Sequence, residues 1–133
     1  MIYPSVDDAL RLHAMVLRAT GGASGVRDMG LLEAAMARPL GAYAGIELYA
    51  TIWEKAGALT HGIARNHPFV DGNKRTALVV GVTFLLLNGH WLEVSQDEME
   101  AVGLGVAEGA LTPADIAKWF EQNSRPDTPR ARG

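Results

Sequence analysis

An uncharged, mostly apolar run, from Ala77 to Leu87, constrains the fold more than any other feature of the sequence. It reads ALVVGVTFLLL and contains no charged residue. A membrane-spanning helix needs about 20 apolar residues, so this run is too short to cross a bilayer. A helix that is apolar nearly all round must instead be covered by other elements. The sequence therefore predicts a central helix from about Asn73 to Leu87, ended by Asn88 and Gly89.

Start and stop signals predict further helices around this central one. Ser5 and Ser95 each precede a carboxylate three residues later, which is the pattern of a capping box. Pro113 follows Thr112 at the first position of a helix. The helix starts that we expect are Ser5, Asp28, Glu47, Asn73, Ser95 and Thr112. Period-two alternation is nearly absent, apart from a short extended segment at 90–94. The predicted class is therefore an all-α bundle of about six helices.

Length and composition bound the architecture and the class of function. The chain has 133 residues, 48% of them hydrophobic, which is enough for one domain with its own core. We place this domain at 1–123 and predict a disordered tail at 124–133, where prolines and arginines gather. Twelve basic residues face fifteen acidic ones, a balance that argues against direct nucleic-acid binding. The chain lacks cysteine and shows no signal peptide, so we expect a soluble, cytoplasmic protein without thiol chemistry or membrane contact.

The loop before the central helix, read with the helix's first residues as NHPFVDGNKRTAL, carries the residues of a candidate phosphate site. The free N–H groups of a helix's first turn bind anions, phosphate above all, and Gly72 lets the backbone approach a ligand closely. Lys74 and Arg75 lie in that turn, where the helix dipole disfavours cations unless an anionic ligand offsets the cost. We therefore assign Gly72, Asn73, Lys74 and Arg75 to phosphate or nucleotide binding.

The same loop offers a base, a metal ligand and an anchor. His67 is a candidate general base because histidine exchanges protons near neutral pH. Asp71 is a candidate Mg²⁺ ligand, since magnesium takes one or two carboxylates together with phosphate oxygens and water. Phe69 is expected to anchor the loop in the core. Together these groups fit a phosphoryl or nucleotidyl transfer site. Ordinary explanations stay open: a structural histidine, an Asp71 that only caps the helix, and solvated surface cations.

The nine residues from His67 to Arg75 resemble the signature of the Fic/Doc family, roughly H-P-F-x-[DE]-G-N-x-R. The Doc ("death on curing") branch is the closer match, and the similarity extends over most of residues 1–123. It includes the segments Gly21-Gly22, Gly25-Val26-Arg27-Asp28, Leu31-Leu32-Glu33, Ala37-Arg38-Pro39, Thr76-Ala77-Leu78, Phe84-Leu85 and Asn88-Gly89. The resemblance implies a compact helical fold with the motif between two central helices. It also implies that His67 accepts a proton, Asp71 holds Mg²⁺ and the helix terminus holds phosphates.

Members of the family catalyse two different transfer reactions. Fic proteins mostly transfer AMP from ATP to a protein hydroxyl. Doc toxins resemble them in fold but phosphorylate a threonine of elongation factor Tu, which halts protein synthesis, and a Phd-type antitoxin neutralises them. From this resemblance we expect a Doc-type toxin that uses ATP with Mg²⁺, targets elongation factor Tu and is silenced by an antitoxin helix in a groove.

Departures from the AMP-transfer pattern favour γ-phosphoryl transfer. Lys74 stands where AMP-transferring members typically carry glycine, and Leu78 stands where they carry a second arginine. The inhibitory pattern [ST]-x-x-x-E-[GN] is also missing, because Leu104 takes the hydroxyl position before Glu108 and Gly109. Inhibition is then expected from another chain. AMP or other nucleotidyl transfer remains the alternative activity. A non-catalytic domain that binds a phosphorylated ligand or a partner is the alternative from another class.

Several residues outside the loop are assigned structural roles. His13 and His90 lack metal-ligand partners at useful spacing. His61 could face the site, but a helix-packing role is favoured, and Arg27-Asp28 fits a capping and ion-pair feature better than a catalytic one. Segment 40–45 falls where Fic proteins carry a flap that docks a target backbone, although a plain connector is the alternative. An exposed apolar strip for the antitoxin is expected near Met15 and Trp91.

Overall fold

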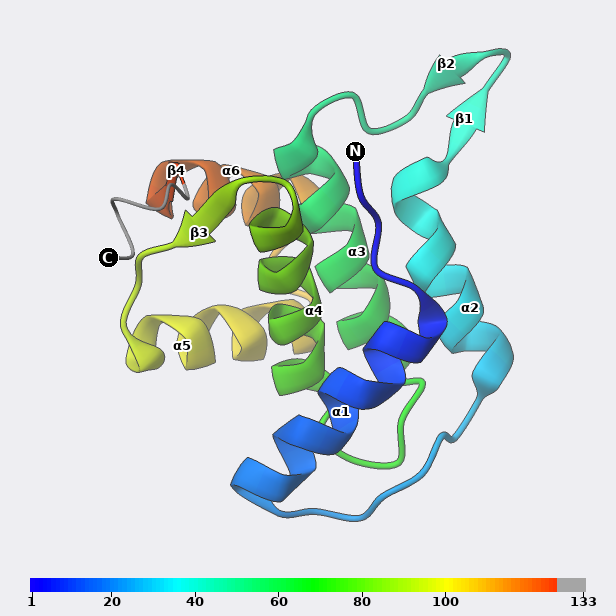
Figure 1. The fold of residues 1–133 in the computed structure, drawn as a ribbon, viewed down its shortest axis with the longest axis vertical. Coiled ribbons are helices and arrows are strands. Elements are labelled where there is room, and N and C mark those ends of the chain that lie inside the picture. Colours follow the sequence, from blue (N-terminus) through cyan, green and yellow to red (C-terminus); the bar gives the residue numbers. More distant parts are fainter. Residues whose placement is uncertain (127–133) are drawn as a thin grey trace.

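A computed structural model describes residues 1–126, whose framework is six α-helices (Figure 1). These are α1 (Val6–Thr20), α2 (Met29–Ala37), α3 (Ile52–Asn66), α4 (Asn73–Leu87), α5 (Gln96–Ala107) and α6 (Pro113–Asn123). A 3₁₀ turn, η1 (Arg38–Leu40), follows α2. Two small antiparallel ribbons pair β1 (Ala42–Tyr43) with β2 (Ile46–Glu47), and β3 (His90–Leu92) with β4 (Ser124–Pro126). The predicted all-α class is confirmed.

Side-chain caps fix where most of the helices begin. Ser5, Ser95 and Thr112 form capping boxes at α1, α5 and α6. Asp28 and Thr51 cap α2 and α3 by accepting a backbone N–H three residues later. Helix α4 differs, because its N-cap is Gly72 and no side chain caps it. Its first turn therefore keeps N–H groups that the other helices have satisfied with a side chain.

The core is built around the α3–α4 pair, which lies in the middle of the bundle in Figure 1. Helix α3 contacts α2, α4, α5 and α6, whereas α4 contacts α1, α3 and α5. The expected centre was α4 alone. The two helices approach closely at Gly81, where an added Cβ would overlap the Thr60 hydroxyl and lie 3.0 Å from the Phe120 ring. Within residues 1–126, no helix is long and apolar enough to cross a membrane.

Two expected boundaries differ from the structure. Helix α3 begins at Ile52 after the Thr51 cap, not at Glu47. Glu47 instead belongs to β2, because its carboxylate pairs with Lys55 and the chain turns before the helix starts. Ser124–Pro126 forms β4 against β3, although we expected the disordered tail to start at Ser124. The rest of that predicted tail, 127–133, lies outside the described residues.

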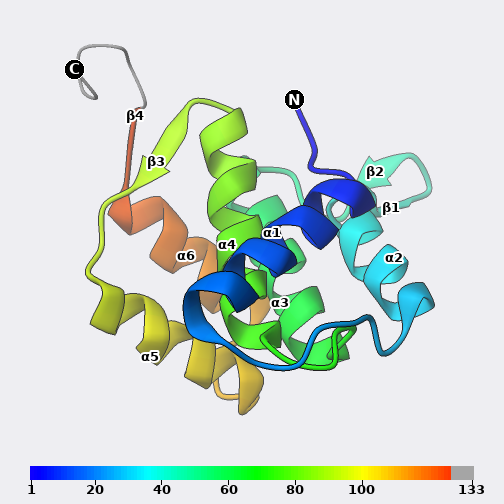
Figure 2. The same cartoon turned by 60° about the horizontal axis from the view of Figure 1, so that its bottom comes forward.

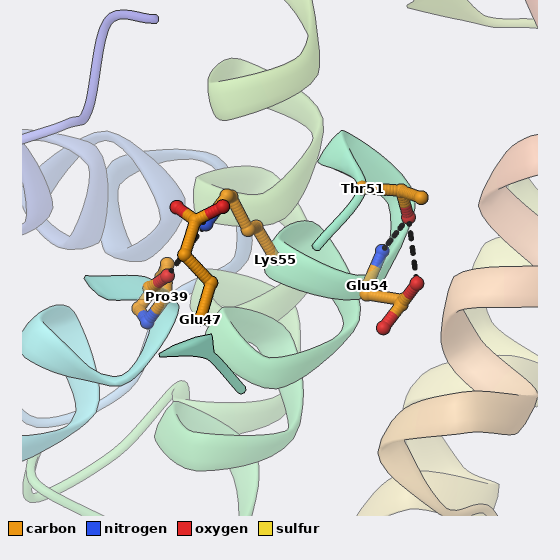
Figure 3. Close-up of polar contacts among 5 residues, drawn as sticks. All are labelled: Pro39, Glu47, Thr51, Glu54 and Lys55. Carbon is orange, nitrogen blue, oxygen red and sulfur yellow. Dashed lines mark hydrogen bonds and ion pairs between the residues drawn. The ribbon is translucent and has the colours of Figure 1, made fainter. Parts of the chain in front are cut away.

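The β1–β2 hairpin projects from one end of the bundle (Figure 1). Its side chains face solvent, with Tyr43 79% and Ile46 73% exposed. Its anchor is the buried Lys55 of α3, whose ammonium donates to the Pro39 carbonyl at 3.1 Å and to the Glu47 carboxylate at 3.0 Å (Figure 3). The segment expected as a flap or connector is therefore an exposed hairpin that one lysine ties to the core.

Candidate active-site loop

Residues 67–72 join α3 to α4 at the end of the bundle that α1 crosses (Figure 2). His67 lies at the C-cap of α3 in the left-handed region, with φ 49° and ψ 56°. A residue with a side chain is disfavoured there, and glycine is the usual occupant of a left-handed helix end. The His67 side chain is exposed. The loop thus keeps a histidine where the backbone alone would favour glycine.

The chain between α1 and α2 runs alongside this loop, as Figure 2 shows. Val26 and Phe69 form an isolated antiparallel bridge, and the Val70 N–H donates to the Gly25 carbonyl at 3.0 Å. The backbone N–H of Arg27 donates to the Pro68 carbonyl at 2.7 Å. The loop is therefore hydrogen-bonded to a second segment along much of its length.

Phe69, the residue expected to anchor the loop, is buried, with 1% of its surface exposed. The His13 ring of α1 stacks on it at a centroid distance of 3.8 Å. His13 also donates from Nε2 to the Asp71 carbonyl at 2.8 Å, because a carbonyl oxygen can only accept. This histidine is thus structural, as expected, and it fixes both ends of the Phe69–Asp71 turn.

Asn73 has a different role from the one expected of its side chain. Its amide is buried, accepting from the Phe69 N–H and donating to the Phe69 carbonyl, both at 2.9 Å. The side chain is therefore committed to closing the turn and is not presented to a phosphate. Only the backbone N–H of Asn73, in the uncapped first turn of α4, stays a candidate for phosphate binding.

The remaining phosphate-site candidates lie at the start of α4. Gly72 is left-handed, with φ 75°, and a Cβ there would come within 3.3 Å of Leu17. Lys74 and Arg75 are both exposed. Arg75 also lies 3.5 Å from the Glu100 carboxylate of α5, an exposed pair that contributes about 0–1 kcal/mol. The structure thus brings two cations to a helix N-terminus that has no side-chain cap.

Asp71 does not cap α4. Its Oδ2 instead accepts the Ala23 N–H at 3.1 Å, and the side chain is exposed. The described residues contain no cluster of three metal-ligating side chains. A single exposed carboxylate beside a candidate phosphate site fits Mg²⁺, which usually relies on few protein ligands and fills its shell with phosphate oxygens and water.

His61 and His90 make hydrogen-bond and packing contacts, and Arg27 makes hydrogen bonds where an ion pair was expected. His61 accepts at Nδ1 from Arg38 at 3.1 Å, and burial, together with the charges of Arg38 and Arg65, lowers its pKa. His90 packs edge-on against Trp53. Arg27 forms no ion pair within residues 1–126, contrary to expectation, and donates instead to the carbonyls of Asn66 and His67.

A groove runs beside this site between α1, α4 and α5, with a cavity volume of about 660 Å³. Lys74 and Arg75 line it together with mostly apolar side chains, namely Val16, Ala19, Leu78, Val79, Val94, Met99 and Leu104. Met15 and Trp91 are exposed, as expected, but neither lines this groove. The apolar surface next to the site is thus centred on α4 and α5 residues.

Comparison with known proteins agrees with this fold and motif. Residues 3–85 match the Fic/DOC family, and the chain belongs to that family. It is 51% identical over 79 residues to "Toxin Doc" of Mycolicibacterium smegmatis, a match that covers 59% of this chain and 61% of the relative. It is 30% identical over 117 residues to "Protein kinase doc" of Escherichia phage P1, covering 88% and 91% of the two chains. Both relatives belong to the Doc branch by name, which agrees with the resemblance at the motif.

Proposed function

We propose that this chain is a Doc-type toxin that transfers the γ-phosphate of ATP to a hydroxyl of a protein target. The observation that carries the proposal is the uncapped N-terminus of α4, which adjoins a loop holding an exposed histidine and an exposed carboxylate. Backbone N–H groups, Lys74 and Arg75 supply the charge that stabilises a transferring phosphoryl group.

The chemistry would be divided among three parts of the site. The His67 ring takes the proton of the attacking hydroxyl. The first turn of α4 and its two cations bind and orient the phosphates. Asp71 would hold Mg²⁺, which neutralises phosphate charge when bound. The buried Phe69 side chain anchors the turn that carries these groups.

The environment of Leu78 favours phosphoryl transfer over AMP transfer. Leu78 is 4% exposed and packs in the α4–α5 interface, where an added Cβ at Gly103 would meet it at 3.0 Å. A second arginine, which AMP transfer typically uses there, is replaced by a side chain committed to packing. The P1 relative is also named a protein kinase. Nucleotidyl transfer remains the second candidate, supported by the intact motif.

Labelled ATP separates the two activities. Purified elongation factor Tu, the target expected from the resemblance, is incubated with the chain and ATP labelled at either the α or the γ phosphate. Phosphoryl transfer labels the target only from the γ position, whereas label from the α position would contradict it. His67→Ala should lower transfer by about 10²–10⁴-fold without loss of fold, since the residue is exposed. Full activity of His67→Ala would exclude the mechanism.

The groove between α1, α4 and α5 fits the proposed partner, an antitoxin segment that folds as an amphipathic helix on binding. An apolar helix face would cover Val79, Met99 and Leu104, while acidic residues near its end would reach Lys74 and Arg75. Such a helix would compete with ATP phosphates for the same cations. ATP binding measured with and without the partner peptide tests this. Binding of both at once, without loss of affinity, would contradict it.

The β1–β2 hairpin is proposed to dock the target backbone. Both of its strands are short and exposed, so their free edges can accept a further strand. Ala42→Pro removes a backbone donor from β1 and should raise the KM for the protein target while the KM for ATP stays unchanged. An unchanged KM for the target would show that the hairpin is only a connector.

A further inference from the structure

We propose that Arg27 is a positioning residue for His67, one that fixes the backbone turn from which the histidine ring projects. The inference rests on the proposed role of His67 in transfer. It starts from an arginine that the sequence assigns to a surface ion pair and that the structure uses otherwise.

The two carbonyls bound by Arg27 bracket one residue. Arg27 donates from Nε to the His67 carbonyl at 2.7 Å and from its terminal nitrogen to the Asn66 carbonyl at 2.8 Å. The Asn66 carbonyl belongs to the peptide group before His67, and the His67 carbonyl belongs to the one after it. A planar guanidinium that holds both peptide groups therefore fixes φ and ψ of His67.

His67 needs such support because its backbone is left-handed, with φ 49°. Replacing it by glycine would relieve the backbone but remove the base. The last carbonyls of α3 also lack partners within the helix, and they form the negative end of its dipole. A cation that donates two hydrogen bonds satisfies both requirements at once.

The segment around Arg27 is built to deliver its side chain there. Its own N–H donates to the Pro68 carbonyl at 2.7 Å, and the Asp28 N–H donates to the same oxygen at 3.1 Å. Asp28 then caps α2, which fixes the direction in which the chain leaves. Backbone and side chain of Arg27 thus act on successive peptide groups, from Asn66 to Pro68.

Amide hydrogen exchange on the full chain tests the positioning without reference to catalysis. In Arg27→Gln, the amides of His67, Phe69 and Val70 should exchange about tenfold faster or more, because two charge-assisted hydrogen bonds are lost. Arg27→Lys keeps the charge but not the planar guanidinium that bonds both carbonyls, so the same loop amides should exchange faster. Arg125→Gln, which removes an exposed arginine paired with Glu93, is the matched control and should change nothing in the loop.

Three exchange results would overturn the proposal. One is unchanged loop exchange in Arg27→Gln. A second is wild-type exchange in Arg27→Lys, because charge alone would then suffice. Faster exchange throughout the chain in both Arg27 variants would also overturn it, since that pattern belongs to a residue that stabilises the whole fold.

Transfer kinetics supply the second readout. Misplacing a catalytic group by about 1 Å can cost about 100-fold, so both Arg27 variants should lower kcat by about 10–100-fold while the KM for ATP stays within about twofold. A raised KM with unchanged kcat would mean that Arg27 acts on the nucleotide, which contradicts the proposal. If the loop responds as expected but the wild type transfers no phosphate, the positioning of His67 stands and the proposed function fails.

Discussion

Removing the Glu47 carboxylate should destabilise the protein more than removing the Lys55 ammonium to which it is paired. The Lys55 side chain is 3% exposed, whereas that of Glu47 is 61% exposed, and their charged atoms lie 3.0 Å apart (Figure 3). Glu47→Gln therefore leaves a cation in a buried position. Lys55→Met removes the cation and puts an apolar chain of similar length in its place.

The expected magnitudes follow from this asymmetry. Removing one partner of a fully buried pair costs about 3–5 kcal/mol. Solvent around Glu47 weakens the pair, and Lys55 keeps its hydrogen bond to the Pro39 carbonyl. We therefore expect Glu47→Gln to lower the free energy of unfolding by about 1–2 kcal/mol. Lys55→Met loses the bond to Pro39 but no longer buries a charge, and its net change should lie within about 1 kcal/mol. In the Lys55→Met background, Glu47→Gln should cost close to nothing.

Denaturant unfolding of the four members of this double-mutant cycle measures the coupling, with His67→Ala in every member so that the proposed toxic activity does not limit expression. A coupling of about 1–2 kcal/mol is expected, because the residues are in direct contact. Glu93→Gln, which breaks the exposed pair with Arg125, should change the free energy of unfolding by less than about 0.5 kcal/mol. If Glu47→Gln costs the same with or without Lys55, the lysine does not hold the hairpin.

Three further predictions concern the core, the metal and pH. Gly81→Ala should destabilise by about 1–3 kcal/mol in thermal unfolding, because the added methyl overlaps the Thr60 hydroxyl, and Thr60→Ala should recover part of the loss. Asp71→Asn should weaken Mg²⁺-dependent nucleotide binding far more than metal-free binding in calorimetry, and equal losses would contradict a metal-ligand role. The pKa of His61 is lowered from 6.5 in the folded state, so the unfolded chain takes up a proton first and stability should fall as pH drops below about 6.5. His61→Gln, which keeps an acceptor but does not titrate, should remove that part of the pH dependence, and an unchanged profile would show that another group causes it.

Local signals in the sequence predicted much of the fold. The capping boxes at Ser5 and Ser95, the helix start at Thr112 and the helix Asn73–Leu87 all stand where they were expected. These features depend on residues only a few positions apart. The predicted start of α3 was wrong because the apolar period continues backwards from Ile52, whereas the Thr51 cap and the pairing of Glu47 with Lys55 make the helix begin only at Ile52.

The groups that shape the site could not be found in this way. The motif located the loop and its anchor Phe69, but Asn73 looked like a phosphate ligand and proved to be a turn-closing side chain. Arg27 and His13 reach the loop from 40 and 58 positions away in the sequence. Their targets are backbone carbonyls, which carry no residue-specific signal, so only the folded chain reveals these contacts.

The anion binding proposed at the uncapped start of α4 should make the stability of this protein depend on the anions in the buffer. A side-chain cap contributes typically about 1 kcal/mol, and α4 does without one. An anion that binds this turn only in the folded state adds RT ln(1 + [L]/Kd), which is about 0.4 kcal/mol at half saturation and about 2.7 kcal/mol at a hundredfold excess over Kd. Melting temperatures in phosphate and in a buffer without small anions would then differ for the same chain. Raising the anion concentration in the buffer is then a ligand titration, in which the melting temperature reports how much of the anion site at the helix end is occupied.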